Sequence, residues 1–269
     1  MRLHQDLRDD IAGCTVPRGT AALWWLGQLG FVLKLGGTIV CIDPFLSPHP
    51  KRQVPPVLDP AELADVSVIC GTHDHSDHID RPAWPLIAQA APKATFVAPA
   101  RLCDSLAAQL ALPRNRFAGL DDGLTLELEG IKITGVASAH EFLDQDASGR
   151  FPYVGCMIEG NGCSIYHSGD CCIYEGLVTK LLNLKPDVMI LPINGRDAVR
   201  YARHCIGNMT YQEAVDLAGS VKPKLVIPGH FDMFAANGEN PQLFMEYLSV
   251  KYPGVRAVVP VHGERIMAG

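Results

Sequence analysis

The segment Thr72-His73-Asp74-His75-Ser76-Asp77-His78 decides what fold and what chemistry we expect of this chain. Within six positions it holds four side chains of the kinds that bind metal ions: His73, His75, Asp77 and His78. The apolar run Val66–Cys70 leads straight into it, as a buried strand would. Residues two apart in an extended chain point the same way, so His73 and His75 can bind one ion while the following turn carries Asp77 and His78 to another. The alternative is a polar surface loop that happens to be rich in histidine, and the buried strand before it disfavours that interpretation.

Three further residues of ligand type lie just past apolar runs that predict strands. These are His140 after 131–137, Asp170 after 164–166 and His230 after 224–227. Any one of them alone would be more typical of a structural loop residue than of a ligand. Together with the first segment they give five histidines and two aspartates, which is enough for two ions bound where strands end.

The other runs predict the layers of the fold. Glycine-punctuated runs at 21–26, 31–35 and 38–42 predict antiparallel strands, and the proline-rich stretch 44–60 predicts a loop. Farther on, helices are expected at 83–91, 102–110, 174–184, 211–221 and 241–252, and strands at 95–98, 124–128, 157–166, 188–192 and 255–259. This order favours an α/β protein with two sheets packed face to face and helices outside.

Composition excludes several classes of protein. The chain has 269 residues, of which 48% are hydrophobic, so it can bury a real core and is not disordered. Its net charge of −6 argues against a protein that binds nucleic acid by charge, and no apolar run is long enough to cross a membrane. We expect a polar arm at 1–20, a single domain at 21–269, and a cytoplasmic protein whose nine cysteines are reduced, because the N-terminus lacks a leader pattern. Assembly into a homo-oligomer stays open.

The seven residues together resemble the signature of the metallo-β-lactamase superfamily, from Leu23 to about Arg265. The resemblance implies an αββα four-layer sandwich of two mixed β-sheets flanked by helices, with two divalent ions that are Mn or Zn, Fe being compatible with the same ligands. It implies that the first ion is bound by His73, His75 and His140, the second by Asp77, His78 and His230, and that Asp170 bridges both. The superfamily members that hydrolyse β-lactams have a cysteine where Asp170 stands, so antibiotic hydrolysis is not expected as the main activity.

Four neighbouring residues have two interpretations each. Asp43 ends a predicted strand and is expected to orient a ligand histidine, the alternative being a turn aspartate before proline. His167 either lines the pocket or hydrogen-bonds a neighbouring strand. Cys171 and Cys172 offer a thiolate near a metal, or, more commonly, buried small hydrophobic side chains.

The charges predict hydrolysis. Two divalent ions, two aspartates and a shared hydroxide leave about one positive charge, which attracts an anionic small-molecule substrate. Asp77 or Asp170 could pass a proton to the leaving group. Arg196 and Asn208 are expected to contact the substrate. Thr210 or Asn208 could instead cap a helix, and Arg196, Arg200 and Arg203 would share one face if their segment were helical.

The motifs at 191–196, 206–210 and 228–234 resemble one branch of the superfamily, which is similar to L-ascorbate-6-phosphate lactonase. This resemblance implies opening of a small, anionic or phosphorylated lactone. A phosphodiesterase acting on nucleic acid or phospholipid head groups through the same metals is one alternative, and a catalytically silent metal-binding sensor is another.

Overall fold

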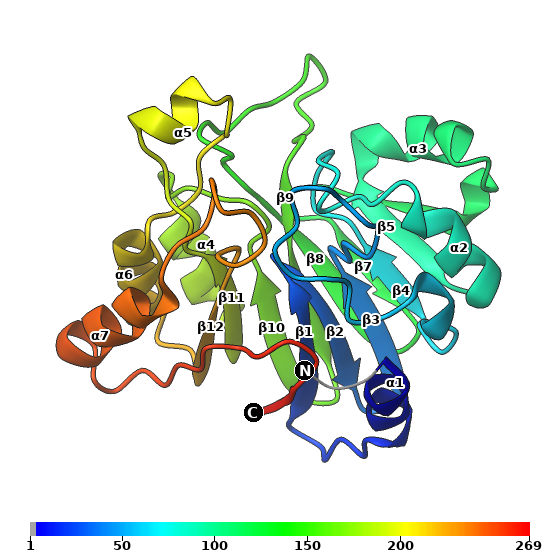
Figure 1. Cartoon of the computed structure of the whole chain (residues 1–269), viewed down its shortest axis with the longest axis horizontal. Coiled ribbons are helices and arrows are strands. Elements are labelled where there is room, and N and C mark those ends of the chain that lie inside the picture. The colour runs from blue at the N-terminus through cyan, green and yellow to red at the C-terminus, as the bar shows by residue number, and fades with distance from the viewer. Residues whose placement is uncertain (1–3) are drawn as a thin grey trace.

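Two β-sheets packed face to face form the centre of the molecule, and helices cover both outer faces (Figure 1). The computed structural model describes residues 4–269. Both sheets mix parallel and antiparallel neighbours, and three apolar clusters fill the two outer interfaces and the space between the sheets. The predicted four-layer αββα sandwich of two mixed β-sheets flanked by helices is confirmed.

The first sheet has seven strands in the order β13-β1-β2-β3-β4-β5-β6. Their bounds are Arg265–Ala268, Ala21–Gly27, Gly30–Leu35, Thr38–Ile42, Val68–Cys70, Thr95–Pro99 and Phe117–Leu120. Strand β1 is buried along its whole length because it has a core on each face: Leu23 and Trp25 point between the sheets, and Trp24 points to the outer helices. Those helices are α1 (His4–Gly13), α2 (Ala83–Ala90) and α3 (Cys103–Gln109).

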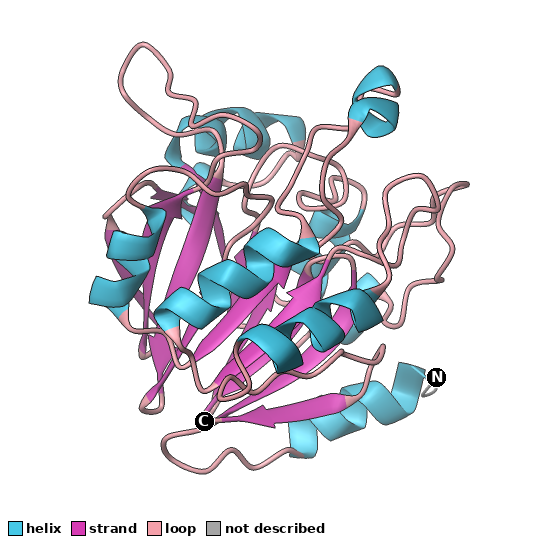
Figure 2. Ribbon diagram, turned by 90° about the vertical axis from the view of Figure 1, so that its left-hand side faces the viewer, coloured by secondary structure: helices cyan, strands magenta, loops and turns pink. Residues whose placement is uncertain are grey.

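The second sheet has six strands in the order β12-β11-β10-β9-β8-β7. Their bounds are Leu225–Gly229, Val188–Pro192, Cys163–His167, Val154–Gly160, Ile131–Ala137 and Thr125–Leu128. Helices α4 (Leu177–Leu184), α6 (Tyr211–Val221) and α7 (Pro241–Lys251) pack on its outer face. Figure 2 faces this side of the molecule and shows helices lying across the strands. The short helix α5 (Ala198–Ala202) stands away from the layers, and 3₁₀ turns occupy Pro60–Glu62, Ala100–Leu102 and Arg114–Arg116.

The segment predicted to be a polar arm contains helix α1, which packs on the first sheet through Leu7 and Ile11. Two long-range contacts hold it there. The Trp24 indole donates to Asp10 over 2.8 Å, and the buried Lys34 ammonium donates to the carbonyls of Ile11 and Ala12. The ammonium therefore satisfies carbonyl groups near the end of the helix that have no helical partner.

Two other predictions of secondary structure need correction, and two strands were not predicted. The strand expected at 157–166 is two strands, β9 and β10, because Asn161 and Gly162 both take positive φ and turn the chain back. The strand expected at 255–259 makes only one bridge, between Ala257 and Val226. The last strand is instead β13, and β6 was not predicted.

The carboxyl ends of β4, β8, β10 and β12 each lead directly into predicted ligands, which the fold brings to one edge of the sandwich. Among residues 4–269, no helix combines the length and apolar character needed to cross a bilayer.

Candidate metal centre

Four of the seven predicted ligands, His73, His75, His140 and Asp170, form the first group of potential metal ligands, here called cluster 1. One potential ligand atom from each lies within 4.8 Å of those of the others. His73 Nε2 and His75 Nδ1 face each other at 2.9 Å. The segment is not extended as expected, since the chain bends here and the His75 N–H donates to the His73 carbonyl over 3.0 Å. His140 Nε2 lies 3.5 Å from Asp170 Oδ2.

The other three, Asp77, His78 and His230, form cluster 2. Asp77 Oδ2 lies 3.7 Å from Nε2 of both histidines. Asp170 also reaches this cluster, since its Oδ1 is 3.4 Å from His78 Nε2 and its Oδ2 is 3.3 Å from His230 Nε2. Asp170 therefore touches both clusters, which is the position a bridging carboxylate needs.

The donor atoms fit a pair of divalent ions. His78 Nε2 and Asp170 Oδ1 are buried and have no hydrogen-bond partner in the structure. A buried polar atom without a partner is costly, and a bound cation would satisfy both of these. Neutral imidazoles with two carboxylates make up a donor set of the kind that Zn, Mn and Fe accept. The two clusters are consistent with a dinuclear site.

Hydrogen bonds behind the ligands fix their orientation. His78 Nδ1 donates to Asp43 Oδ2 over 2.7 Å, and His140 Nδ1 donates to the Gly207 carbonyl over 3.0 Å. These bonds leave Nε2 of each ring free to bind a metal. Asp43 also accepts the backbone N–H and the hydroxyl of Thr72, which ties the start of the ligand segment to the end of β3. The contact with His78 is the one that the sequence-based hypothesis gave Asp43.

Burial and charge act differently on the two clusters. Burial is the main cause that lowers the pKa of His73, His75 and His140, so these rings stay neutral. Burial alone would also lower the pKa of His78 and His230, but Asp170 and other nearby carboxylates outweigh it and raise the pKa of both.

The two aspartates are held in the ionised form that a metal requires. Burial alone would raise the pKa of Asp77 and Asp170. The nearby His78 and His230 rings outweigh burial and lower the pKa of both, that of Asp170 well below its ordinary value.

Gln28 is a site residue that the sequence did not reveal. It lies in the turn between β1 and β2 at φ 52°, and its Nε2 donates to Asp77 Oδ2 over 2.8 Å. Its backbone N–H donates to Asp232, and Asp232 also bonds His262. These hydrogen bonds hold the turn that carries Gln28 in place. Gln28 thus holds the Asp77 oxygen that faces the His78 and His230 rings.

A cavity of about 220 Å³, here called the metal cavity, opens over the ligands. Ligands of both clusters form its floor, and it is also lined by His204, Cys205, Ile206, Phe234 and Asn237. None of these five was predicted. They come from the loops after α5 and β12, far apart in the sequence.

Arg196 and Asn208 were predicted to contact substrate, but neither lines this cavity. The Arg196 guanidinium forms two hydrogen bonds with Glu213, both 2.7 Å, and a third with the Asn208 carbonyl. The Asn208 side chain is fully buried and donates to Asn194. A direct substrate contact by Arg196 stays a prediction, and it would require the guanidinium to leave Glu213.

The predicted arginine row does not form. Helix α5 spans only 198–202, so Arg196 precedes the helix and Arg203 is its C-cap residue. Arg200 bonds Asp197 and the Gly238 carbonyl. Thr210, not Asn208, caps the following helix α6.

The remaining ambiguous residues have other partners. His167 is buried and does not line the metal cavity. Its Nε2 bonds the carbonyl of Leu29 over 2.7 Å, in the turn between β1 and β2 rather than in a strand. Burial raises the pKa of the Cys171 thiol to about 12 and also raises the pKa of Cys172. Neither sulfur belongs to a metal cluster. Both are buried thiols, as the commoner interpretation of this pair held.

Comparison with known proteins supports the same conclusion. Residues 38–231 match the model of the beta-lactamase superfamily domain. The chain is 29% identical over 246 residues to a UPF0173 metal-dependent hydrolase from Sulfurisphaera tokodaii, covering 91% of this chain and 98% of that protein. It is 27% identical over 277 aligned positions to a probable L-ascorbate-6-phosphate lactonase UlaG from Salmonella heidelberg, covering 88% of this chain and 76% of that protein. Among solved structures, the metallo hydrolase Igni18 from Ignicoccus hospitalis superposes with a TM-score of 0.71 at 22% identity, covering 92% of this chain and 98% of that one.

Proposed function

This chain belongs to the metallo-β-lactamase superfamily and is a metal-dependent hydrolase, and we propose that it opens the ring of a small lactone that carries an anionic group. The observation that carries the proposal is Asp170, whose carboxylate lies within 3.5 Å of ligand nitrogens in both clusters. An aspartate that spans both clusters suits two ions sharing one water. The resemblance to lactonases supplies the choice of ester.

A pair of divalent ions held by the two clusters would lower the pKa of bound water and polarise the carbonyl of the lactone. Hydrolysis of a lactone adds water across the ring C–O bond and gives a hydroxy acid, so the departing oxygen needs a proton. Asp77 is the better placed of the two aspartates to pass that proton. Its side chain is 18% exposed toward solvent, whereas that of Asp170 is 5% exposed.

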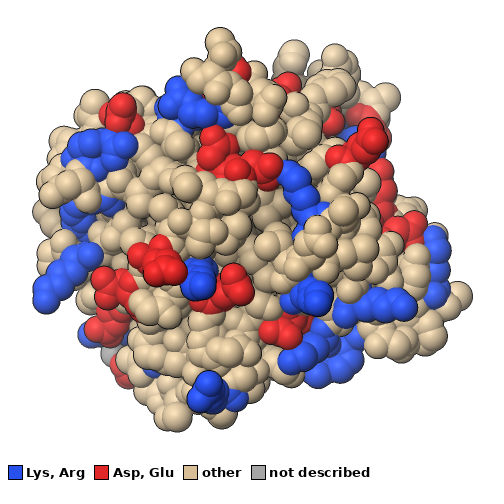
Figure 3. All heavy atoms as spheres, turned by 180° about the vertical axis from the view of Figure 1, so that it is seen from behind, with Lys and Arg blue, Asp and Glu red and all other residues tan. Residues whose placement is uncertain are grey.

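The metals rather than the arginines supply the positive charge that an anionic substrate needs. Arg196 and Arg200 are paired with Glu213 and Asp197. The proposed ions are Mn²⁺ or Zn²⁺, with Fe also compatible with the nitrogen and oxygen donors. On the face drawn in Figure 3, basic and acidic side chains are interspersed, which supports a small-molecule substrate over a long nucleic acid.

The test is turnover by metal-loaded protein on a panel of lactones with and without a phosphate group, beside a model phosphodiester such as bis(p-nitrophenyl) phosphate. We expect lactone hydrolysis that is lost on chelation and restored by Mn²⁺ or Zn²⁺. The variant Asp170→Asn should lose activity by on the order of 100-fold or more. Asp187→Asn is the matched control, since Asp187 bonds Ser164 and Lys224 and touches no ligand. Turnover of the diester without any lactone hydrolysis would overturn the proposal.

A further inference from the structure

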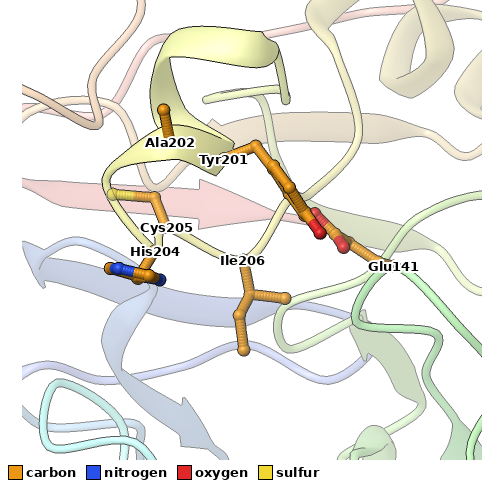
Figure 4. A pocket seen from close by; sticks show the side chains of 6 residues that line it. All are labelled: Glu141, Tyr201, Ala202, His204, Cys205 and Ile206. Carbon is orange, nitrogen blue, oxygen red and sulfur yellow. The ribbon is translucent and has the colours of Figure 1, made fainter.

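A second cavity adjoins the metal centre and is not used by the chemistry described above. It measures about 500 Å³ and is lined by Glu141, Tyr201, Ala202, His204, Cys205 and Ile206. Figure 4 shows Tyr201 projecting from the end of α5 toward Glu141, and Ile206 projecting from the loop that follows α5. We call it the side cavity.

The side cavity adjoins the metal cavity, because His204, Cys205 and Ile206 line both. Pockets for drug-sized ligands measure roughly 300–1,000 Å³. At about 220 Å³ the metal cavity alone suits a small ring, and the side cavity adds more than twice that volume next to it.

Three of the six residues that line the side cavity, Tyr201, Ala202 and Ile206, offer apolar surface, and the other three are Glu141, His204 and Cys205. Tyr201 is 72% exposed and Ile206 is 38% exposed, and large apolar surfaces left in water are typical of ligand grooves. No Lys or Arg is among the residues that line the cavity in the described part of the chain. The only acidic group there is the Glu141 carboxylate, which would repel a phosphate or carboxylate tail.

Hydrogen bonds tie these walls to the metal ligands. Glu141 directly follows His140, and its Oε1 accepts the Gly207 N–H over 2.9 Å. The carbonyl of the same Gly207 accepts from His140 Nδ1. On the other wall, Arg200 donates to the Gly238 carbonyl and holds α5 in place. The cavity is therefore positioned relative to cluster 1 by direct contacts.

We propose that the side cavity binds an apolar, uncharged substituent of the substrate, such as an alkyl or acyl chain, while the lactone ring lies over the metals. Tyr201 and Ile206 contact the chain, and Glu141 excludes an anionic group at this end. The anionic group of the proposed function then belongs beside the metals. This assignment rests on the proposed lactonase function for its substrate class.

The experiment compares kcat/KM for γ-butyrolactone with that for γ-lactones carrying straight alkyl chains of two to six carbons, and for one ending in a carboxylate. We expect kcat/KM to rise about threefold for each methylene until the cavity is filled. The lactone whose chain ends in a carboxylate should show no rise in kcat/KM over γ-butyrolactone. In Tyr201→Ala the advantage of the hexyl lactone over γ-butyrolactone should shrink about tenfold, and in Glu141→Gln the carboxylate-ended lactone should improve. Val199→Ala is the control, because Val199 is on the same helix and 60% exposed but does not line the cavity.

A binding measurement separates the two proposals. By calorimetry, 2-hexylcyclopentanone, which cannot be hydrolysed, should bind at least tenfold more tightly than cyclopentanone, and Tyr201→Ala should remove the difference. If no lactone is hydrolysed but this difference is found, the lactonase proposal fails and the cavity assignment stands. If lactones are hydrolysed at rates independent of chain length, or if the carboxylate-ended chain is preferred, the cavity assignment is wrong.

Discussion

Replacing Asp43 by asparagine should weaken metal binding at cluster 2 without removing any ligand. Asp43 is fully buried, and its Oδ2 accepts from both His78 Nδ1 and the Thr72 hydroxyl, each over 2.7 Å. Its Oδ1 accepts the Thr72 backbone N–H over 2.8 Å. An asparagine that keeps the last bond must turn its NH₂ group toward His78.

The NH₂ group and the protonated His78 Nδ1 are both donors, so they cannot pair. The Thr72 hydroxyl can rotate and accept, but His78 must move its proton to Nε2, which is the atom that binds the metal. Loss of a hydrogen bond that orients a ligand histidine typically lowers metal affinity by 10–100-fold. This corresponds to about 1.4–2.7 kcal/mol at cluster 2.

The assay is a titration of metal-free protein with Zn²⁺ against a chromophoric chelator, fitted to two dissociation constants. Asp43→Asn should raise one constant by 10–100-fold and change the other much less. Asp187→Asn is again the control, because Asp187 accepts the backbone N–H and the hydroxyl of Ser164 just as Asp43 accepts those of Thr72. If both dissociation constants of Asp43→Asn equal those of the wild type, the reasoning that the hydrogen bond from Asp43 orients His78 is refuted.

Three other predictions concern the same centre. As the pH falls from about 8 to about 6, cluster 2 should lose its ion before cluster 1. The raised pKa of His78 and His230 lets protons compete with the metal for these rings, whereas burial lowers the pKa of the cluster 1 histidines. The number of bound ions, counted by mass spectrometry after gel filtration at each pH, checks this, and simultaneous loss of both ions would contradict it. Gln28→Ala removes the amide that holds Asp77 Oδ2 and should weaken binding at cluster 2 about tenfold in the same titration, with wild-type affinity as the contrary result. Arg196→Ala should lower the free energy of unfolding by about 1 kcal/mol or less in urea, since its ion pair is partly exposed. If Arg196 also contacts substrate, turnover of anionic lactones should fall more than that of neutral ones, and equal loss on both would count against that role.

The ligands could be predicted because their positions depend on local geometry. His73 and His75 sit two apart after a strand, and His140, Asp170 and His230 each follow the end of another. In the two packed sheets, the carboxyl ends of the strands that precede these residues lie at the same edge of the sandwich. Residue type and position relative to a strand were therefore enough to gather the seven residues, and the resemblance to the superfamily supplied their division between two ions.

Contacts between distant segments could not be predicted in this way. Gln28 meets Asp77 across 49 positions, and the contact depends on a left-handed turn that the sequence does not single out. Arg196 was expected to face the pocket because it follows strand β11, but Glu213 on helix α6 binds it. The apolar run at 255–259 has the composition of a strand, yet it meets β12 at a single bridge, between Ala257 and Val226.

The most direct test of the central claim is a crystal structure of metal-loaded protein with anomalous scattering data at the Zn or Mn edge. The account predicts two peaks about 3.5–4 Å apart, one among His73, His75 and His140 and the other among Asp77, His78 and His230, with Asp170 between them. A single peak at full metal loading, or two peaks with Asp170 bound to neither, would contradict it.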